Sequence, residues 1–99
     1  TLLAFGLRGH LYRSPDGGRS WTAIPTGTDA TLTCALDLGA GRFVVGGMDG
    51  TLLWSEGAGA AVRKQDLPDR KAIVAIARGA PGTLLLVGEG GVRRVEIPR

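Results

Sequence analysis

The sequence predicts an all-β protein made of short antiparallel strands joined by tight turns. Its 99 residues include 17 glycines, and apolar residues make up 43% of the chain. The apolar residues form short runs separated by glycines, which is typical of many short strands rather than of helices. The best helix candidate, residues 70–77, contains the β-branched Ile73, Val74 and Ile76, and these residues favour a strand.

Three segments of the chain resemble one another at a spacing of 41 residues. They begin at Thr1, Arg42 and Thr83 and read TLLAFGLRGHLYRS, RFVVGGMDGTLLWS and TLLLVGEGGVRRVE. In each segment an apolar run leads into Gly-x-x-Gly, which predicts a two-residue hairpin turn whose glycines adopt backbone angles that other residues resist. Asp49-Gly50 is a favoured dipeptide for such a turn. The recurring glycines are Gly6 and Gly9, Gly47 and Gly50, and Gly88 and Gly91.

Each repeat contains about four short strands. A third run covers residues 22–24 and 61–63, and a further run covers residues 32–38 and 73–77. A period of about 40–45 residues with four strands per unit is the signature of a β-propeller blade. We therefore expect one propeller segment over residues 1–99, with repeat units 1–41 and 42–82 and a partial unit 83–99. Three strands from the first unit, four from the second and about three from the third make about two and a half four-stranded antiparallel blades.

This number of blades cannot close a ring, because each blade buries its faces against its neighbours. An open stack would expose two blade faces and its edge strands. We expect the chain to be part of a longer propeller whose remaining blades cover these surfaces. Self-association of several copies is the alternative.

The segment SPDGGRSW, residues 14–21, is interpreted as a turn rather than as a phosphate or calcium loop. Its aspartate can accept hydrogen bonds from turn amides, its glycines permit positive φ, and its serines can bond the local backbone. Its tryptophan is expected to begin the next strand and to bury its ring on the hairpin. The P-loop signature does not occur in the sequence, and one aspartate does not supply a calcium loop. The assigned turn residues are Ser14, Asp16, Gly17, Gly18, Ser20 and Trp21.

The same segment resembles the Asp-box, or BNR repeat, whose pattern is Ser-x-Asp-x-Gly-x-Thr-Trp. The five matching positions are Ser14, Asp16, Gly18, Ser20 and Trp21, with serine in place of threonine. The preceding GLRGHLYR resembles the Ycf48-like branch of these propellers, which is related to a photosystem II assembly and stability factor. The resemblance implies that the box is structural and lies away from the ligand face. The second unit lacks the aspartate and the tryptophan, and the third ends before a box.

This resemblance implies a non-enzymatic scaffold that binds protein partners, with an extracytoplasmic (periplasmic or secreted) location. The sequence assigns no catalytic constellation, no metal site and no cofactor. The alternative is part of a sialidase-like Asp-box glycoside hydrolase whose catalytic residues lie outside this chain. Such enzymes need carboxylates placed across a cleft, and the candidates here are Asp37, Asp49 and Glu89, with Tyr12 the single tyrosine.

Charge and the reactive side chains argue against several other classes. The net charge is +3, and the basic residues are scattered among acids rather than forming the stripe expected for nucleic-acid binding. The single cysteine, Cys34, cannot form an internal disulfide and is expected to be buried and inert. The single histidine, His10, is expected on a strand face, and one histidine does not make a zinc site. No apolar run approaches the roughly 20 residues of a membrane helix.

Overall fold

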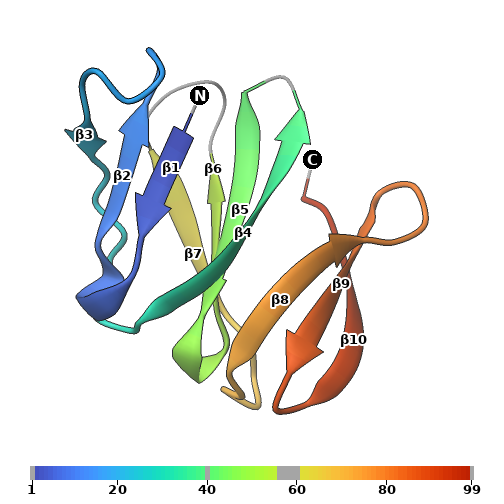
Figure 1. The fold of residues 1–99 in the computed structure, drawn as a ribbon. Helices are drawn as coiled ribbons and strands as arrows, with labels where there is room; N and C mark the ends of the chain where they lie inside the picture. The colour runs from blue at the N-terminus through green and yellow to red at the C-terminus, as the bar shows by residue number, and fades with distance from the viewer. Residues whose placement is uncertain (1, 40, 56–60, 99) are drawn as a thin grey trace.

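The protein is built from strands arranged in three antiparallel sheets. The computed structural model describes residues 2–39, 41–55 and 61–98, and the regular structure in these ranges is β-strand apart from short turns. Figure 1 shows the three sheets following one another across the molecule in chain order. The all-β class predicted from the glycine-separated apolar runs is confirmed.

Each sheet is a meander in which consecutive strands are hydrogen-bonded neighbours. The N-terminal sheet contains β1 (Leu2–Phe5), β2 (Leu11–Ser14) and β3 (Thr22–Ala23). The middle sheet contains β4 (Leu32–Gly39), β5 (Arg42–Gly47), β6 (Thr51–Ser55) and β7 (Val62–Asp66). The C-terminal sheet contains β8 (Ile73–Arg78), β9 (Thr83–Gly88) and β10 (Gly91–Glu96). The sheets do not coincide with the predicted repeat units, because β4 lies within residues 1–41 and β8 within residues 42–82.

The middle and C-terminal sheets repeat the same strand pairing at the predicted spacing of 41 residues. Leu32 of β4 pairs with Gly47 of β5, and Ile73 of β8 pairs with Gly88 of β9. A register shift follows at the same position in both sheets, immediately after these pairs. The weak internal repeat of the sequence is therefore also a repeat of backbone geometry.

Hydrogen bonds that join each hairpin turn to the segment before the sheet recur with the same spacing. The main-chain N–H of Met48 donates to the carbonyl of Thr31 over 2.9 Å, and that of Glu89 donates to the carbonyl of Ala72 over 3.1 Å. Both donors directly follow the first glycine of a Gly-x-x-Gly segment. The glycine segments thus fix the start of the first strand of each sheet as well as forming hairpins.

The hairpin turns depend on the second glycine of each Gly-x-x-Gly segment. Arg8 and Gly9 have φ of 57° and 72°, and Asp49 and Gly50 have φ of 60° and 69°. Left-handed angles at both central residues are those of a type I′ turn, which matches the twist of the flanking strands. Gly91, at the third copy of the position, has a φ of 79°. In the first two copies the turn is therefore centred one residue later than the midpoint of the motif. In the third copy Gly88 pairs with Gly91, so residues 89 and 90 form the turn at the midpoint, as predicted.

The first glycine of each pair has a different purpose from the one predicted. Gly47 has a φ of −160° and a ψ of −167°, which is extended backbone, so the prediction that it supplies an unusual angle is wrong. A Cβ atom on Gly47 would overlap the carbonyl oxygen of Thr31, and one on Gly88 would overlap that of Ala72. Glycine is needed at these two positions because two backbone segments approach closely there.

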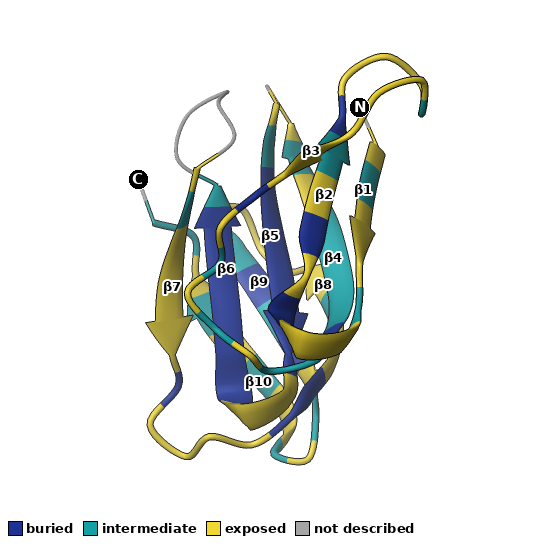
Figure 2. Cartoon of the chain, turned by 90° about the vertical axis from the view of Figure 1, so that its left-hand side faces the viewer, coloured by how far each residue is buried: buried dark blue, intermediate teal, exposed yellow. Residues whose placement is uncertain are grey.

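Two apolar cores lie between the three sheets. Alternate residues of a strand point to opposite faces, so Val44 and Leu52 face the C-terminal sheet while Val45 and Leu53 face the N-terminal sheet. The middle sheet is therefore buried on both sides, as the dark strands β5 and β6 show in Figure 2. The first core contains Leu11, Ile24, Leu32, Phe43, Val45 and Leu53. The second core contains Val44, Leu52, Trp54, Leu67, Ile73, Leu84 and Leu86.

The two end sheets each bury one face and leave the other exposed. Leu2 and Tyr12, on the outer face of the N-terminal sheet, are 46% and 38% exposed, and Val92, on the outer face of the C-terminal sheet, is 68% exposed. The three described sheets form an open stack and not a closed ring. No helix within the described ranges has the length and apolarity that crossing a membrane requires.

Candidate functional site

The turn predicted at residues 14–21 is organised around the carboxylate of Asp16. Oδ1 accepts hydrogen bonds from the main-chain N–H groups of Arg19 and Ser20, each over 3.0 Å, and from the hydroxyl of Ser14 over 2.8 Å. Oδ2 accepts from the Ser20 hydroxyl over 2.6 Å. One carboxylate therefore closes the loop by bonding both main chain and side chains.

Ser14 anchors this loop to the N-terminal sheet. It is the last residue of β2, pairs with Leu2 of β1, and is fully buried. Its hydroxyl donates to Asp16 and accepts from the main-chain N–H of Gly18 over 2.8 Å. Gly17 and Gly18 have φ of 77° and 97°, angles that strongly favour glycine. Each residue from Ser14 to Ser20 that was assigned to the turn has a local contact or angle that accounts for its identity.

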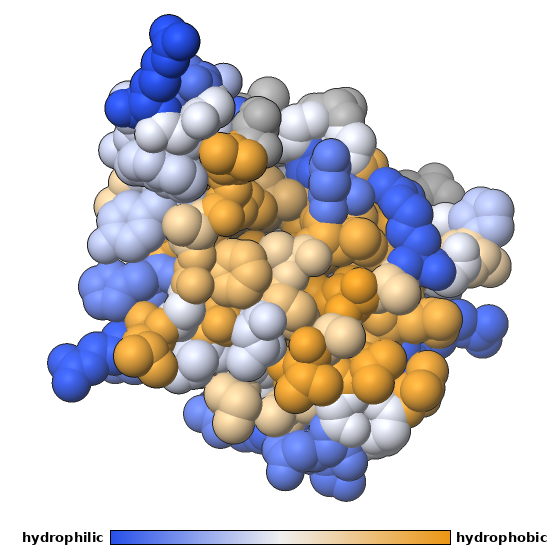
Figure 3. Space-filling model, viewed as in Figure 1, coloured by the Kyte–Doolittle hydropathy of each residue, from blue (hydrophilic) through white to orange (hydrophobic). Residues whose placement is uncertain are grey.

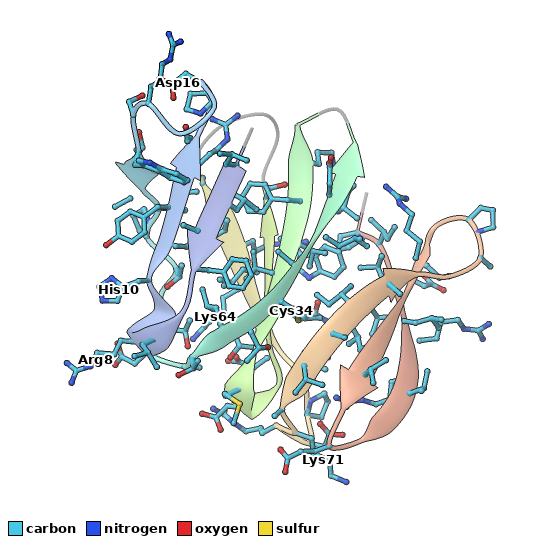
Figure 4. All side chains as sticks on the ribbon, in the orientation of Figure 1. Arg8, His10, Asp16, Cys34, Lys64 and Lys71 are labelled. Carbon is cyan, nitrogen blue, oxygen red and sulfur yellow. The ribbon has the colours of Figure 1, made fainter. Side chains whose placement is uncertain are left out.

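The carboxylate of Asp16 is ionised and already engaged by its own loop. Hydrogen bonds from the hydroxyl and N–H of Ser20, followed by that from the Ser14 hydroxyl, lower its pKa from 3.8 to about 2. Figure 4 shows Asp16 at the outer tip of the loop, at the opposite end of the molecule from Lys71. Within the described ranges, no three His, Cys, Asp or Glu side chains cluster as metal ligands. The hydrogen bonds of the carboxylate are made within the turn.

Trp21 departs from its expected placement. It lies just before β3 rather than within it, and 45% of its surface is exposed, so the prediction that its ring is buried on the hairpin is wrong. The indole N–H donates to the carbonyl of Gly18 over 3.2 Å, which holds the ring against the loop. The local contact is present, but no neighbouring element covers the rest of the ring among the described residues.

The candidate carboxylates for glycoside hydrolysis have separate local partners. Asp37 accepts from the N–H of Gly39 over 2.8 Å, and Glu89 accepts from the N–H of Ala72 over 2.7 Å. Asp37 pairs with Phe43 at one end of the β4–β5 ladder, whereas Asp49 lies in the turn at the other end. Six residues of strand place these two acids roughly 15–20 Å apart. A glycosidase pair needs about 5–10 Å, so these two acids do not form one.

Tyr12 and His10 lie together on the exposed side of the N-terminal sheet. Their rings stack with centroids 6.2 Å apart and an angle of 2° between planes, and the Tyr12 hydroxyl lies 3.5 Å from His10 Nδ1. Tyr12 is in β2, and His10 directly precedes that strand. This places the tyrosine beside a histidine and away from the three candidate acids in the pairing scheme.

Cys34 is half-buried in β4 rather than fully buried as predicted. Burial raises the pKa of its thiol, against the lowering effect of the Thr33 hydroxyl and the Gly46 main chain. A raised pKa keeps the sulfur protonated and weakly nucleophilic. The thiol is therefore better described as a small apolar side chain than as a nucleophile.

Basic side chains are interspersed with acids on the surface. Arg93 pairs with Asp69 at 2.6 Å, and Lys64 lies 3.7 Å from Asp66. Lys64 also donates to the carbonyl of Gly27 over 3.2 Å. These contacts fit the mixed surface predicted from the sequence, in which acids stand beside the denser basic groups.

The feature that sequence reasoning did not locate is a groove between β1 and β4. It has a volume of about 400 Å³. In Figure 3, apolar side chains gather over the face on which β1, β4 and β8 lie in Figure 1. The apolar residues lining the groove are Leu2, Leu3, Phe5, Ala35, Leu36 and Phe43.

Comparison with known proteins does not assign the chain to a family. No protein-family model, no curated protein and no solved structure matches its sequence or fold.

Proposed function

We propose that the chain is a segment of an Asp-box β-propeller of the Ycf48-like kind that acts as a non-enzymatic, protein-binding scaffold. The observation that carries the proposal is the recurrence of strand pairing, register shift and cross-segment hydrogen bonds at 41 residues. Four-stranded meanders that repeat at about this length and stack face to face are the construction of propeller blades.

The middle sheet supplies the complete unit in this proposal. Its four strands, β4 to β7, correspond to one blade. Among the described strands, the N-terminal sheet has no counterpart of β4 and the C-terminal sheet has none of β7. The Asp16 loop would then be the structural box of the first blade. The Asp16 carboxylate accepts its hydrogen bonds from residues of its own loop, which supports a structural role rather than ligand binding.

The scaffold function is favoured over hydrolysis by the placement of the acids. Asp37 and Asp49 lie at opposite ends of a ladder, and the carboxylates of Asp37 and Glu89 are occupied by main-chain N–H groups. Protein-binding surfaces instead need exposed side chains on a rigid frame. Arg8, in the exposed turn before β2, and Arg94, on the exposed side of β10, are such side chains.

The test is partner capture from the natural source with the wild type and three charge-reversal variants. Arg8→Glu and Arg94→Glu are expected to weaken capture of one discrete protein partner, whereas Arg19→Glu, in the box loop, leaves it unchanged. The same preparations are assayed against a panel of aryl glycosides that includes sialosides. Capture that is insensitive to both Arg8→Glu and Arg94→Glu would contradict an arginine-lined docking surface. Turnover of any glycoside would contradict the non-enzymatic assignment.

A further inference from the structure

The chain contains two Asp-Gly dipeptides, Asp16-Gly17 and Asp49-Gly50, in turns of different construction. Glycine after aspartate favours isomerisation, because no Cβ hinders attack by the glycine nitrogen on the aspartate side chain. In this reaction the nitrogen bonds to the carboxyl carbon, and its proton leaves with the carboxyl hydroxyl as water. Water then opens the succinimide ring at the main-chain carbonyl, and the chain continues through the side-chain carbonyl as isoaspartate. One water is released and one is consumed, with no change in oxidation state.

The turn at Asp49 can bring the reacting atoms together by flipping a single peptide. Asp49 has a φ of 60° and a ψ of 20°, and the main-chain N–H of Thr51 closes the turn by donating to the Met48 carbonyl. Flipping the peptide between Asp49 and Gly50 converts the type I′ turn into a type II′ turn, in which ψ of the first central residue is about −120°. At that ψ the nitrogen of the next residue eclipses Cβ. Rotation of the side chain alone then brings the Asp49 carboxyl carbon onto the Gly50 nitrogen.

The contacts around this turn permit the flip. Glycine tolerates either sign of φ, so Gly50 can leave its φ of 69° without a steric cost. The Gly50 carbonyl, which accepts from the Leu67 N–H over 2.9 Å, belongs to the next peptide and keeps its bond. Asp49 is exposed, and the nearest hydroxyl in sequence, that of Thr51, is directed to Asp66. The Asp49 carboxyl group is therefore accessible to water. Because aspartate is strained at the first central position of a type II′ turn, the flipped turn is a minor state and the reaction is slow.

The loop at Asp16 prevents the same reaction. Its carboxylate accepts hydrogen bonds from the N–H groups of Arg19 and Ser20 and from the hydroxyls of Ser14 and Ser20. These bonds must break before the carboxyl carbon can turn toward the Gly17 nitrogen. The hydrogen bonds from Ser20 and Ser14 also lower the pKa of Asp16 from 3.8 to about 2. The protonated carboxyl group, which releases water, is therefore more than tenfold rarer near pH 5.5 than in an aspartate of ordinary pKa.

We propose that the Asp49-Gly50 turn is a site of spontaneous isomerisation in the folded protein, and that the Asp16 loop protects the other Asp-Gly dipeptide. The product carries one extra main-chain carbon in a two-residue turn that needs left-handed angles at both central positions. This turn joins β5 and β6, the two strands of the middle sheet that are almost wholly buried. Isomerisation at Asp49 is therefore expected to destabilise the middle sheet.

The experiment follows both dipeptides in one sample of the protein. The sample is incubated near pH 5.5 at about 37 °C, either folded or in concentrated urea, and is then digested with trypsin. Cleavage after arginine releases residues 14–19 and 43–63, each of which contains one aspartate. Liquid chromatography separates the aspartate and isoaspartate forms, and electron-transfer fragmentation distinguishes them. We expect similar rates at the two sites in urea, and in the folded protein a rate at Asp16 at least tenfold below that at Asp49.

Two variants assign the sites, and the comparison of folded with urea-unfolded protein needs neither. Ser20→Ala removes the exposed hydroxyl that donates to Asp16 Oδ2, so it should speed isomerisation of Asp16 several-fold and leave that of Asp49 unchanged. Asp49→Glu, whose longer side chain forms only a six-membered ring, should abolish the isomer of peptide 43–63 and leave peptide 14–19 as in the wild type. Circular dichroism checks that both variants remain folded. The purified isoaspartate form of the wild type should melt at a lower temperature than the unmodified protein.

Three results would overturn the inference. The first is isomerisation at equal rates at the two sites of the folded protein. The second is the failure of the peptide 43–63 isomer to accumulate in the folded protein by the time the urea sample is half converted, because the turn would then not flip. The third is a Ser20→Ala variant in which Asp16 isomerises as slowly as in the wild type, because the hydrogen bonds of the loop would then not protect it.

Discussion

Replacing Gly47 by alanine tests whether close backbone contact between the turn and the segment before β4 constrains the middle sheet. The new Cβ would lie well inside the roughly 3.5 Å of an ordinary contact with the Thr31 carbonyl oxygen. Relieving the overlap separates the two segments and lengthens the 2.9 Å hydrogen bond from Met48 to Thr31. Overpacking costs about 1–3 kcal/mol and a lost hydrogen bond about 1 kcal/mol, so we expect about 2–4 kcal/mol of destabilisation.

The matched control is Gly6→Ala, one repeat earlier. Neither glycine has a left-handed φ, so neither substitution forces a left-handed alanine. A Cβ on Gly6 meets nothing within 4 Å, so the overlap that Gly47→Ala creates is absent and the change should cost less than about 1 kcal/mol. Gly88→Ala, one repeat later, should resemble Gly47→Ala because its Cβ would overlap the Ala72 carbonyl.

Thermal and urea unfolding followed by circular dichroism measure these effects. For a domain of this size, about 1 kcal/mol shifts Tm by about 4–8 °C, so Gly47→Ala should lower Tm by roughly 10–25 °C. Gly6→Ala should leave Tm within a few degrees of the wild type or above it. If Gly47→Ala and Gly6→Ala melt together, the close approach of the Thr31 carbonyl does not constrain the fold and the reasoning is refuted.

Three further predictions concern the Asp16 loop and the cores. The pKa of Asp16 is about 2 in the folded protein and near 3.8 in the unfolded one, so its stabilising effect is present above about pH 4 and is lost as the pH falls toward 2. Asp16→Asn should therefore remove most of the fall in the free energy of unfolding between pH 4 and 2. Urea unfolding between pH 6 and 2 measures this change. Ser14→Ala, which removes a buried hydroxyl bonded to two groups, should cost about 1–3 kcal/mol in the same assay, whereas Ala in place of the exposed Ser20 should cost less. Leu52→Ala and Leu53→Ala, which open different cores, should each cost about 2–5 kcal/mol, and a variant of either that unfolds like the wild type would contradict the two-core arrangement.

Strands and turns were predictable because their signals are local. A run such as Phe43–Gly47 followed by Asp49-Gly50 specifies a strand and a type I′ turn within a few residues. The Asp16 loop was predictable for the same reason, since its bonds join residues no more than four apart in the sequence. Periodicity then indicated the spacing of 41 residues at which the pairing of the middle and C-terminal sheets repeats.

Features that depend on contacts between distant segments were not predictable from the sequence. Glycine is required at position 47 because the carbonyl of Thr31, sixteen residues earlier in the chain, approaches its Cα closely. Backbone propensity describes only the φ and ψ of the glycine itself and does not predict that contact. The exposure of Trp21 depends on which elements come close enough to cover its ring. The groove beside β1 arises from the spacing of two sheets, and nothing within residues 2–5 encodes it.

The outer face of the N-terminal sheet carries a pattern that its own exposure does not explain. One position of the repeat is apolar in all three copies, as Leu2, Phe43 and Leu84. Phe43 and Leu84 are only 4% and 0% exposed, whereas Leu2 is 46% exposed. Phe43 and Leu84 are buried because the preceding sheet packs on them, in the first and second cores. An exposed leucine at position 2 lowers solubility and makes no stabilising contact on this face in the isolated stack. The retained apolar residue therefore supports the proposal that a further element covers this face.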